Sequence, residues 1–211
     1  MNFLNFKRAL CLSPHPDDVE YGMAGTILKF PKTQFDILCL GCGGDFDKST
    51  NPIRLNEVKN FWSESKCENV NVFTSPHLMI KSISVDAWIN FIETEYINKH
   101  LYDVIFIPPT IDSHFEHQIV SSFGLALTRQ APISVIEYCT PSTLENWVAN
   151  LHVDITDTYI SKLNLMKEFK SQKDRAYFSR ETLEYFHFHY QLAKRGIHRI
   201  ERYKTLHHIV K

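Results

Sequence analysis

Two short polar segments contain the side chains best suited to chemistry in this chain of 211 residues. The first is SPHPDD at residues 13–18, and the second is DSHFEH at residues 112–117. Each combines imidazoles with carboxylates, which supply the nitrogen and oxygen ligands that zinc binds in proteins. These residue types indicate a site for a divalent metal ion.

The spacing within each segment suits a single ion. His15 and Asp18 are three residues apart on an expected strand-to-helix turn, whereas the side chain of the adjacent Asp17 should point elsewhere and can exchange protons. His114 and His117 are three apart at a predicted helix start and share one face. One of these two histidines can supply the third protein ligand, which leaves a fourth position for water, as a catalytic zinc ion requires.

Each of these features alone has an ordinary structural explanation. Adjacent aspartates before a helix often act as caps, and two histidines on one helix face are often incidental. Their joint placement favours a function, because both segments follow predicted buried strands. In open α/β folds that edge of the sheet is where ligands bind.

Short apolar runs alternate with segments of helical spacing, which predicts an α/β fold with a mostly parallel sheet and helices on both faces. The predicted strands are Ala9–Ser13, Phe35–Gly41, Val70–Thr74, Val104–Ile107 and Ile133–Tyr138. The predicted helices between them are Val19–Phe30, Ile53–Ser65, Val85–Lys99 and Glu116–Thr128. Beyond Trp147 we expect a strand at His152–Ile155 and helices at Thr158–Ser171 and Arg180–Lys194. The length fits one domain over residues 1–211, with residues 180–211 as a C-terminal extension.

The composition argues against several partners. The formal net charge is -1, from 23 basic and 24 acidic residues, so no electrostatic attraction to nucleic acid or a membrane surface is expected. No apolar run reaches the ~20 residues of a membrane helix, and the first residues lack a signal-peptide pattern. Cys11, Cys39 and Cys139 lie in apolar runs, which favours buried thiols and a cytoplasmic location. The oligomeric state stays open, including a homo-oligomer.

Basic residues concentrate near the C-terminus, within fifteen positions, at Lys194, Arg195, His198, Arg199, Arg202, Lys204, His207 and His208. The simpler interpretation is a solvated basic surface. The alternative is a wall that attracts an anionic substrate, such as a phosphorylated or nucleotide-linked sugar. The wider segment Tyr185–His208 is also rich in aromatic residues and could form a subunit interface or a cap over a sugar.

The first polar segment continues as Val19-Glu20 and is followed by Gly25-Thr26-Ile27, a pattern that resembles the opening signature of the PIG-L/LmbE-like N-acetylglucosaminyl deacetylases. The second signature of that family, His-Pro-Asp-His, is similar to residues 114–117. Weaker matches follow in order at Arg54 with Glu57, at Lys162 and at Ser171-Gln172. The resemblance implies a Rossmann-like sheet and a bound zinc ion.

Carried over to this chain, the resemblance implies that His15, Asp18 and His117 bind the metal. Asp17 would be the general base, and His114 would stabilise the oxyanion or help to protonate the departing amine. The implied reaction is hydrolysis of an N-acyl group, in particular N-acetyl, from a small-molecule amino sugar or its conjugate. Zinc is the expected ion, although two histidines and an aspartate also accept iron(II), cobalt or manganese.

Two further roles are expected near this site. Asp112 would orient His114, as carboxylates beyond the ligands often do. Arg54 would hold substrate hydroxyls or a phosphate, with a surface ion pair to Glu57 as the alternative. The chain also departs from the family at Met23-Ala24, in place of a glycine-rich pair, and at Phe115-Glu116, in place of Pro-Asp. Neither change removes an expected ligand.

Other functions have weaker support. Residues 38–45, LCLGCGGD, resemble the glycine loop of an S-adenosylmethionine-dependent methyltransferase, but they follow the second expected strand and the next strand lacks an acid at its end. We instead expect Gly41, Gly43 and Gly44 to form a loop at the mouth of the same pocket. The single C-x-x-C at Cys39 and Cys42 has no second pair to complete a structural zinc site. A non-catalytic descendant that binds only sugar or metal would have no need of an acid at position 17.

Overall fold

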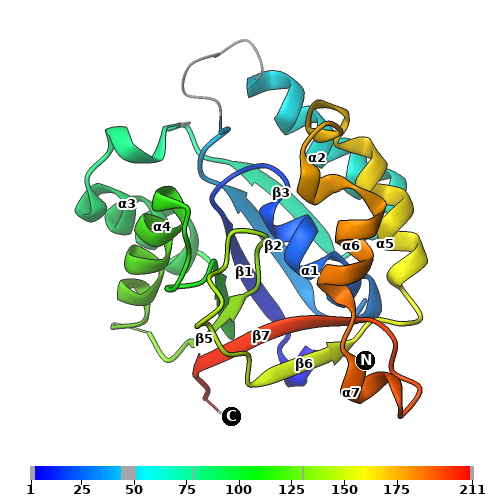
Figure 1. The fold of residues 1–211 in the computed structure, drawn as a ribbon. Coiled ribbons are helices and arrows are strands. Elements are labelled where there is room, and N and C mark those ends of the chain that lie inside the picture. The colour runs from blue at the N-terminus through cyan, green and yellow to red at the C-terminus, as the bar shows by residue number, and fades with distance from the viewer. Residues whose placement is uncertain (1–2, 44–50, 78, 130, 210–211) are drawn as a thin grey trace.

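The structure is a computed structural model that describes residues 3–43, 51–77, 79–129 and 131–209. One sheet of seven strands runs through them in the order β3-β2-β1-β4-β5-β7-β6 (Figure 1). The strands are β1 (Arg8–Ser13), β2 (Gln34–Cys39), β3 (Val70–Thr74), β4 (Val104–Ile107), β5 (Ser134–Tyr138), β6 (Leu151–Asp154) and β7 (Ile200–His207). β1 to β5 pair in parallel, and β7 is antiparallel to β5 and β6. The mostly parallel α/β fold expected from the sequence is confirmed.

Helices cover both faces of the sheet (Figure 1). On one face lie α3 (Val85–Ile92) and α4 (Phe115–Ala126), and on the other lie α1 (Asp18–Lys29), α2 (Asn51–Ser65), α5 (Tyr159–Leu165) and α6 (Arg180–His187). The residues of β1 alternate between two apolar cores, with Ala9 and Cys11 in one core and Leu10 and Leu12 in the other. A strand buried on both faces reads as a continuous apolar run, which is why the sequence revealed it. Over the described residues, no helix combines the length and apolar character needed to cross a membrane.

The strand order places the two polar segments together. β2 and β3 lie on one side of β1, and the chain then crosses over to form β4 on the other side of β1. Such a reversal opens a crevice at the carboxyl ends of the two strands that flank it. The loop after β1 contains residues 13–18 and the connection after β4 contains residues 112–117, so both segments line this crevice.

The expected elements agree with the structure as far as β6 and differ beyond it. The six expected strands match β1 to β6 to within two residues. The expected helix Thr158–Ser171 is α-helical only to Leu165 and continues as short 3-10 turns. The expected helix Arg180–Lys194 is interrupted at Phe188 and His189, which have extended backbones, before the short α7 (Tyr190–Ala193). Aromatic residues and histidine favour helices weakly, so packing decides the backbone there.

β7 has no counterpart among the expected elements. The basic C-terminal segment contributes this strand to the sheet itself, between β5 and β6. The strand is not predicted from the sequence because charged residues stand at positions that the fold buries. Glu201 is fully buried, and Arg202 is partly buried. Lys194, Arg195 and His198 are exposed, as expected for a solvated basic surface.

A buried ion pair joins this C-terminal strand to α1. Lys162 Nζ lies 2.6 Å from Glu201 Oε1, and both side chains are almost fully buried. Lys162 also donates to the carbonyl of Tyr21 at 2.5 Å, while Gly25 and Thr26 donate their backbone N–H groups to the Glu201 carboxylate at 2.8 and 2.7 Å. In a regular helix the N–H of residue 25 bonds to the carbonyl of residue 21. Here Glu201 accepts from that N–H and Lys162 donates to that carbonyl, so the ion pair contacts both groups. α1 is thereby fastened to α5 and β7.

We expect Lys162→Met to lower the free energy of unfolding by about 3–5 kcal/mol, because it leaves the Glu201 carboxylate buried without its cation. The matched control is Lys99→Met, which removes the exposed pair between Lys99 and Glu95 and should cost less than about 1 kcal/mol. Urea denaturation followed by circular dichroism measures both. Equal, small losses in the two variants would show that the buried pair does not stabilise the fold.

Candidate functional site

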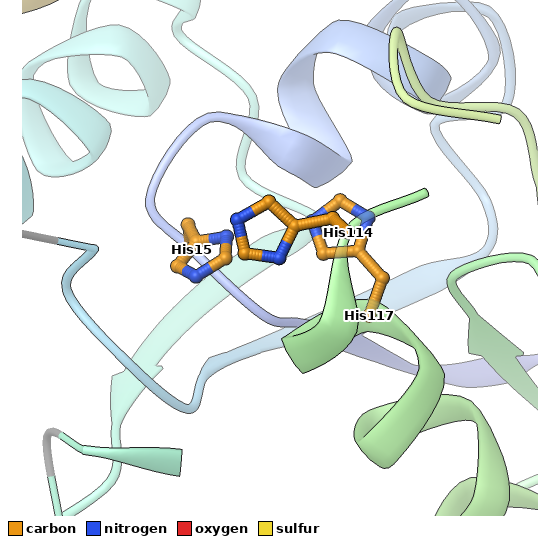
Figure 2. A group of neighbouring side chains, drawn as sticks. All are labelled: His15, His114 and His117. Atoms are coloured by element: carbon orange, nitrogen blue, oxygen red, sulfur yellow. The ribbon is translucent and has the colours of Figure 1, made fainter. Parts of the chain in front are cut away.

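Three imidazole rings gather in the crevice between β1 and β4 (Figure 2). His15 comes from the loop after β1, and His114 and His117 come from the start of α4. The ring centroids are 4.7 Å apart for His15 and His114, 5.4 Å for His15 and His117, and 4.6 Å for His114 and His117. One nitrogen from each ring lies within 4.8 Å of one nitrogen of each other ring. The cluster is compact enough for its nitrogens to share one metal ion.

The carboxylate of Asp18 lies between two of these rings. Its Oδ2 is 3.2 Å from His15 Nδ1 and 3.2 Å from His117 Nε2. Ligands of a tetrahedral zinc ion, at bond lengths near 2.1 Å, are roughly 3.4 Å apart, so these separations suit such an ion. His117 Nε2 is also buried and faces the Asp18 carboxylate. The donor atoms of His15, Asp18 and His117 therefore fit a divalent metal.

A second carboxylate holds the far side of the His15 ring. Glu116 Oε2 lies 2.6 Å from His15 Nε2, and both side chains are buried. A carboxylate in this position fixes the orientation of a metal-binding ring and raises its basicity. The sequence does not predict this role for Glu116, which stands there only as a departure from the family pattern between two histidines. Its position one residue before His117 was the available signal.

Asp112 orients a different histidine from the one expected. Its Oδ2 is 3.1 Å from His117 Nδ1 and accepts a hydrogen bond from Thr140 at 2.7 Å. Its Oδ1 accepts from the backbone N–H of His114 at 2.7 Å, so Asp112 holds His114 through the main chain and not through the ring. Although burial opposes ionisation, the bond and charge of His117 hold the pKa of Asp112 below its usual range.

The buried charges stabilise one another strongly. Burial disfavours the charged forms of Asp18 and His117, yet the pKa of Asp18 lies well below its usual value because His117 and His15 face it. Burial likewise lowers the pKa of His117, but the charges and hydrogen bonds of Asp18 and Asp112 raise it to about 10. Carboxylates that stabilise positive charge on these imidazoles also suit a bound cation.

Asp17 is buried beside the cluster, and its side chain does not cap α1 although it stands at the capping position. It occupies the position before α1 with φ of 124°, a strained value for a residue other than glycine, and its side chain makes no capping hydrogen bond. Burial raises the pKa of Asp17 to about 7, despite the opposing charge of Arg54. A carboxyl with a pKa in the neutral range is suited to exchanging protons.

Arg54 of α2 holds this carboxyl and the glycine loop. Its Nη2 lies 3.2 Å from Asp17 Oδ2, and its Nη1 donates to the carbonyls of Cys42 and Gly43 at 2.8 and 3.2 Å. Gly43 has φ of 56°, and a Cβ there would collide with the Arg54 guanidinium. The alternative pairing with Glu57 is not observed, because Glu57 accepts two hydrogen bonds from Ser171 at 2.7 and 2.6 Å.

The ring of His114 is the most exposed of the three. Its Nδ1 accepts a hydrogen bond from the backbone N–H of Glu116 at 3.3 Å. Burial and the neighbouring His15 and His117 rings lower the pKa of His114, which favours the neutral ring. With Nδ1 accepting, the proton of the neutral ring is on Nε2, which makes Nε2 a hydrogen-bond donor.

A pocket of about 380 Å³ contains these groups. The seven lining residues discussed so far are His15, Asp17, Asp18, Gly43, Arg54, His114 and His117. Gln172, Arg175, Tyr177, Pro141 and Ser142 complete the wall. Gly43 thus lies at the pocket, as expected, whereas Gly44 of the same loop falls outside the described residues.

Residues 10–128 match the family model of the GlcNAc-PI de-N-acetylases, PIG-L. Among solved structures, the chain is similar to the N,N'-diacetylchitobiose deacetylase of Pyrococcus horikoshii, with 21% identity, 97% of this chain and 85% of that one covered, and a TM-score of 0.72. It is also similar to the A40926 pseudoaglycone deacetylase Dbv21, with 13% identity, coverage of 97% and 99%, and a TM-score of 0.73. No match is found among curated proteins.

A further similar structure is the 4-carboxy-2-hydroxymuconate hydratase GalB of Pseudomonas putida KT2440, with 14% identity, coverage of 97% and 98%, and a TM-score of 0.74. At such identities the solved structures establish a shared fold. A hydratase among them means that the fold alone does not determine the reaction, which must be argued from the site.

We expect Asp112→Ala to weaken divalent metal binding by about 10- to 100-fold, because the ring of His117 loses the carboxylate that orients it. The matched control is Asp86→Ala on the exposed surface of α3, which should bind metal as the unaltered protein does. Competition with a chromophoric zinc chelator measures the affinity, and circular dichroism checks that both variants fold. Unchanged affinity in the folded Asp112→Ala protein would rule out this positioning role.

Proposed function

The chain belongs to the PIG-L family of GlcNAc-PI de-N-acetylases, and from that premise we propose that it is a metal-dependent hydrolase acting on an amino sugar or its conjugate. The bond that it cleaves is the amide of an N-acyl group, in particular N-acetyl. The observation that carries this proposal is the position of Asp18 Oδ2, 3.2 Å from both His15 Nδ1 and His117 Nε2. The buried carboxyl of Asp17 next to it adds the proton acceptor that hydrolysis needs.

In this proposal His15, Asp18 and His117 hold the metal. Three protein ligands leave a position open for water and substrate, as in catalytic zinc sites. When bound, the ion polarises the amide carbonyl and lowers the pKa of water beside it. Zinc is the ion that we propose, and iron(II) or cobalt would suit the same donors.

Asp17 acts as the general base. It accepts a proton from the attacking water while the water oxygen bonds to the amide carbon. Its burial and its pKa of about 7 support this role, as does its freedom from a capping bond. Arg54 positions the carboxylate through the 3.2 Å contact with Oδ2. The carbon–nitrogen bond then breaks, so that the acyl group leaves as a carboxylate and the sugar nitrogen gains a proton.

His114 stabilises the oxygen of the amide carbonyl, which becomes negative during the attack. Its Nε2–H is a donor, because Nδ1 already accepts from the backbone of Glu116. Donors positioned before the reaction stabilise developing charge at little cost in reorganisation. The proton that the departing amine gains comes from Asp17, which took it from the attacking water, because a neutral imidazole that lost its Nε2 proton would become a strongly basic anion.

The pocket supports a small polar substrate. A volume of about 380 Å³ lies within the range of small-molecule sites. Gln172 and Arg175 line its wall and can donate to sugar hydroxyls. Two proteins of similar fold are described as deacetylases of diacetylchitobiose and of the A40926 pseudoaglycone, which favours an N-acyl sugar over the hydratase chemistry that the fold also accommodates.

We further propose a cytoplasmic location. All five cysteines are free, and Cys11, Cys39, Cys42 and Cys139 are buried, which suits a reducing compartment. The near-neutral net charge of -1 supports a small molecule as partner instead of nucleic acid.

We expect Asp17→Asn to retain the metal and to lower kcat by about 100- to 10,000-fold, because the amide cannot accept the proton. The matched control is Asp86→Asn, an exposed carboxylate on α3, which should keep full activity. Release of free amine from N-acetylglucosamine and its glycosides measures turnover, and elemental analysis measures bound metal. Full activity in the Asp17→Asn protein would disprove the assigned base. If neither the parent protein nor the variant turns over any of these compounds, the proposed hydrolysis itself fails and a binding-only or other function has to be considered.

A further inference from the structure

A cavity outside the proposed catalytic site lies between α5 and α6, which stand side by side on one face of the sheet (Figure 1). Its volume is about 350 Å³. We call it the basic pocket and define it by its ten lining residues, which are Leu163, Asn164, Met166, Lys167, Phe169, Lys170, Lys173, Phe178, Arg180 and Leu183. None of them lines the pocket that contains Asp17, so the basic pocket is a separate site.

The floor of the basic pocket is apolar and belongs to the core. Met166, Phe169 and Leu183 are 3%, 1% and 4% exposed. Phe178, whose ring centroid is 5.8 Å from that of Phe169, and Leu163 are only partly buried and pack against the same core. Side chains packed in a core keep their places whether or not a ligand is present. The pocket therefore offers a preformed apolar surface to the hydrocarbon part of a small molecule.

The rim of the basic pocket is positively charged. Four of the ten lining residues are cationic and exposed, and no lining residue is acidic. The four are Lys167, Lys170, Lys173 and Arg180. Because the whole chain has a formal net charge of -1, these residues are a local concentration of positive charge. Charge of one sign around a cavity raises the local concentration of ions of the opposite sign, here anions.

Neighbouring carboxylates neutralise only part of this charge. Arg180 Nε lies 2.8 Å from Glu184, and Lys170 Nζ lies 3.9 Å from Glu168. The cationic side chains of these pairs are 73% and 77% exposed, and exposed ion pairs are weak. A ligand can therefore compete for both cations.

The other two cations have no acidic partner. Lys167 Nζ donates to the neutral amide oxygen of Asn164 at 3.0 Å. Neither Lys167 nor Lys173 forms an ion pair within the part of the chain that the structure describes. Their ammonium groups can therefore bind an anion without first losing a carboxylate.

We propose that the basic pocket binds an organic anion with an apolar body, such as a medium-chain fatty acid. The hydrocarbon part lies on the floor of Met166, Phe169 and Leu183, and the acidic group meets Lys167 and Lys173 at the rim. Burial of apolar surface supplies affinity, and charge-assisted hydrogen bonds orient the ligand. A volume of about 350 Å³ lies within the range of small-molecule sites. This ligand is distinct from the substrate, so the inference does not rest on the proposed function.

Other occupants fit the basic pocket less well. An inorganic anion would meet the cations but would leave the apolar floor in water. A neutral hydrocarbon would cover the floor and leave the positive charge without a counterion. The surface of an anionic membrane would meet the exposed cations, but it would not follow the concave pocket to its floor.

The experiment measures the fluorescence of 1-anilinonaphthalene-8-sulfonate, an anion with an aromatic body, bound to the folded protein. We expect decanoate, below the concentration at which it forms micelles, to displace this probe, and we expect decyltrimethylammonium and inorganic sulfate to displace it at least tenfold less well. Lys173→Glu should weaken decanoate binding by about tenfold or more, because a hydrogen-bonding cation becomes a repelling anion. Lys32→Glu, on the exposed turn between α1 and β2, makes the same change in net charge and should bind decanoate as the unaltered protein does.

A second variant tests the floor of the pocket. Leu163→Trp fills the cavity and should abolish displacement by decanoate, with circular dichroism as the check on folding. If this variant does not fold, Lys173→Glu still decides the question, because it changes an exposed residue.

Three results would overturn the proposal. Equal affinities of Lys173→Glu and Lys32→Glu for decanoate would show that the anion binds elsewhere. Equal displacement by decyltrimethylammonium would show binding without selection for negative charge. Sedimentation of the protein with phosphatidylglycerol vesicles, without binding of monomeric decanoate, would assign this surface to a membrane instead.

Discussion

The arrangement of this site depends on one buried negative charge, the carboxylate of Asp18. Asp18 is buried, and a buried carboxylate is costly unless cations or hydrogen bonds face it. The rings of His15 and His117 meet its Oδ2 at 3.2 Å from two sides, and each ring is held from behind by a further carboxylate, Glu116 or Asp112. Carboxylates and imidazoles therefore alternate through the crevice. Such an arrangement keeps three donor atoms directed at one point, which is what a metal ion needs and what a surface cluster would not maintain.

The fold provides the rigidity that this arrangement requires. Asp17 and Asp18 start α1, and α1 is fastened in its middle by the Lys162–Glu201 pair and at its side by Glu20, which accepts a hydrogen bond from Trp62 at 2.6 Å. The C-terminal part of the chain is therefore not an accessory to the site. It holds the helix that positions the carboxylates, and its Arg202 lines the pocket that adjoins the proposed site. Stability and function depend here on the same strand, β7.

Much of this architecture is readable from the sequence, for a physical reason. Parallel strands buried on both faces, such as β1 and β4, are continuous apolar runs, and the chemistry follows at their carboxyl ends. The residues brought together by the crevice, from His15 to His117, could thus be named in advance. Contacts that depend on tertiary packing could not be predicted from the sequence. The sequence gives no sign that Glu116 holds His15 or that Asp112 contacts the ring of His117 instead of that of His114. It also conceals β7, because the buried Glu201 of that strand is paired with Lys162, which lies on another element.

The central claim is that His15, Asp18 and His117 hold one catalytic metal ion. Its most direct test is the metal content of protein purified without chelators, measured by plasma mass spectrometry beside the His15→Ala variant. We predict about one divalent ion per chain in the unaltered protein and a loss of that ion in the variant, as expected for a site with three protein ligands. If zinc offered at neutral pH binds neither protein, or binds both equally, the cluster is not a metal site and the proposed hydrolysis loses its basis.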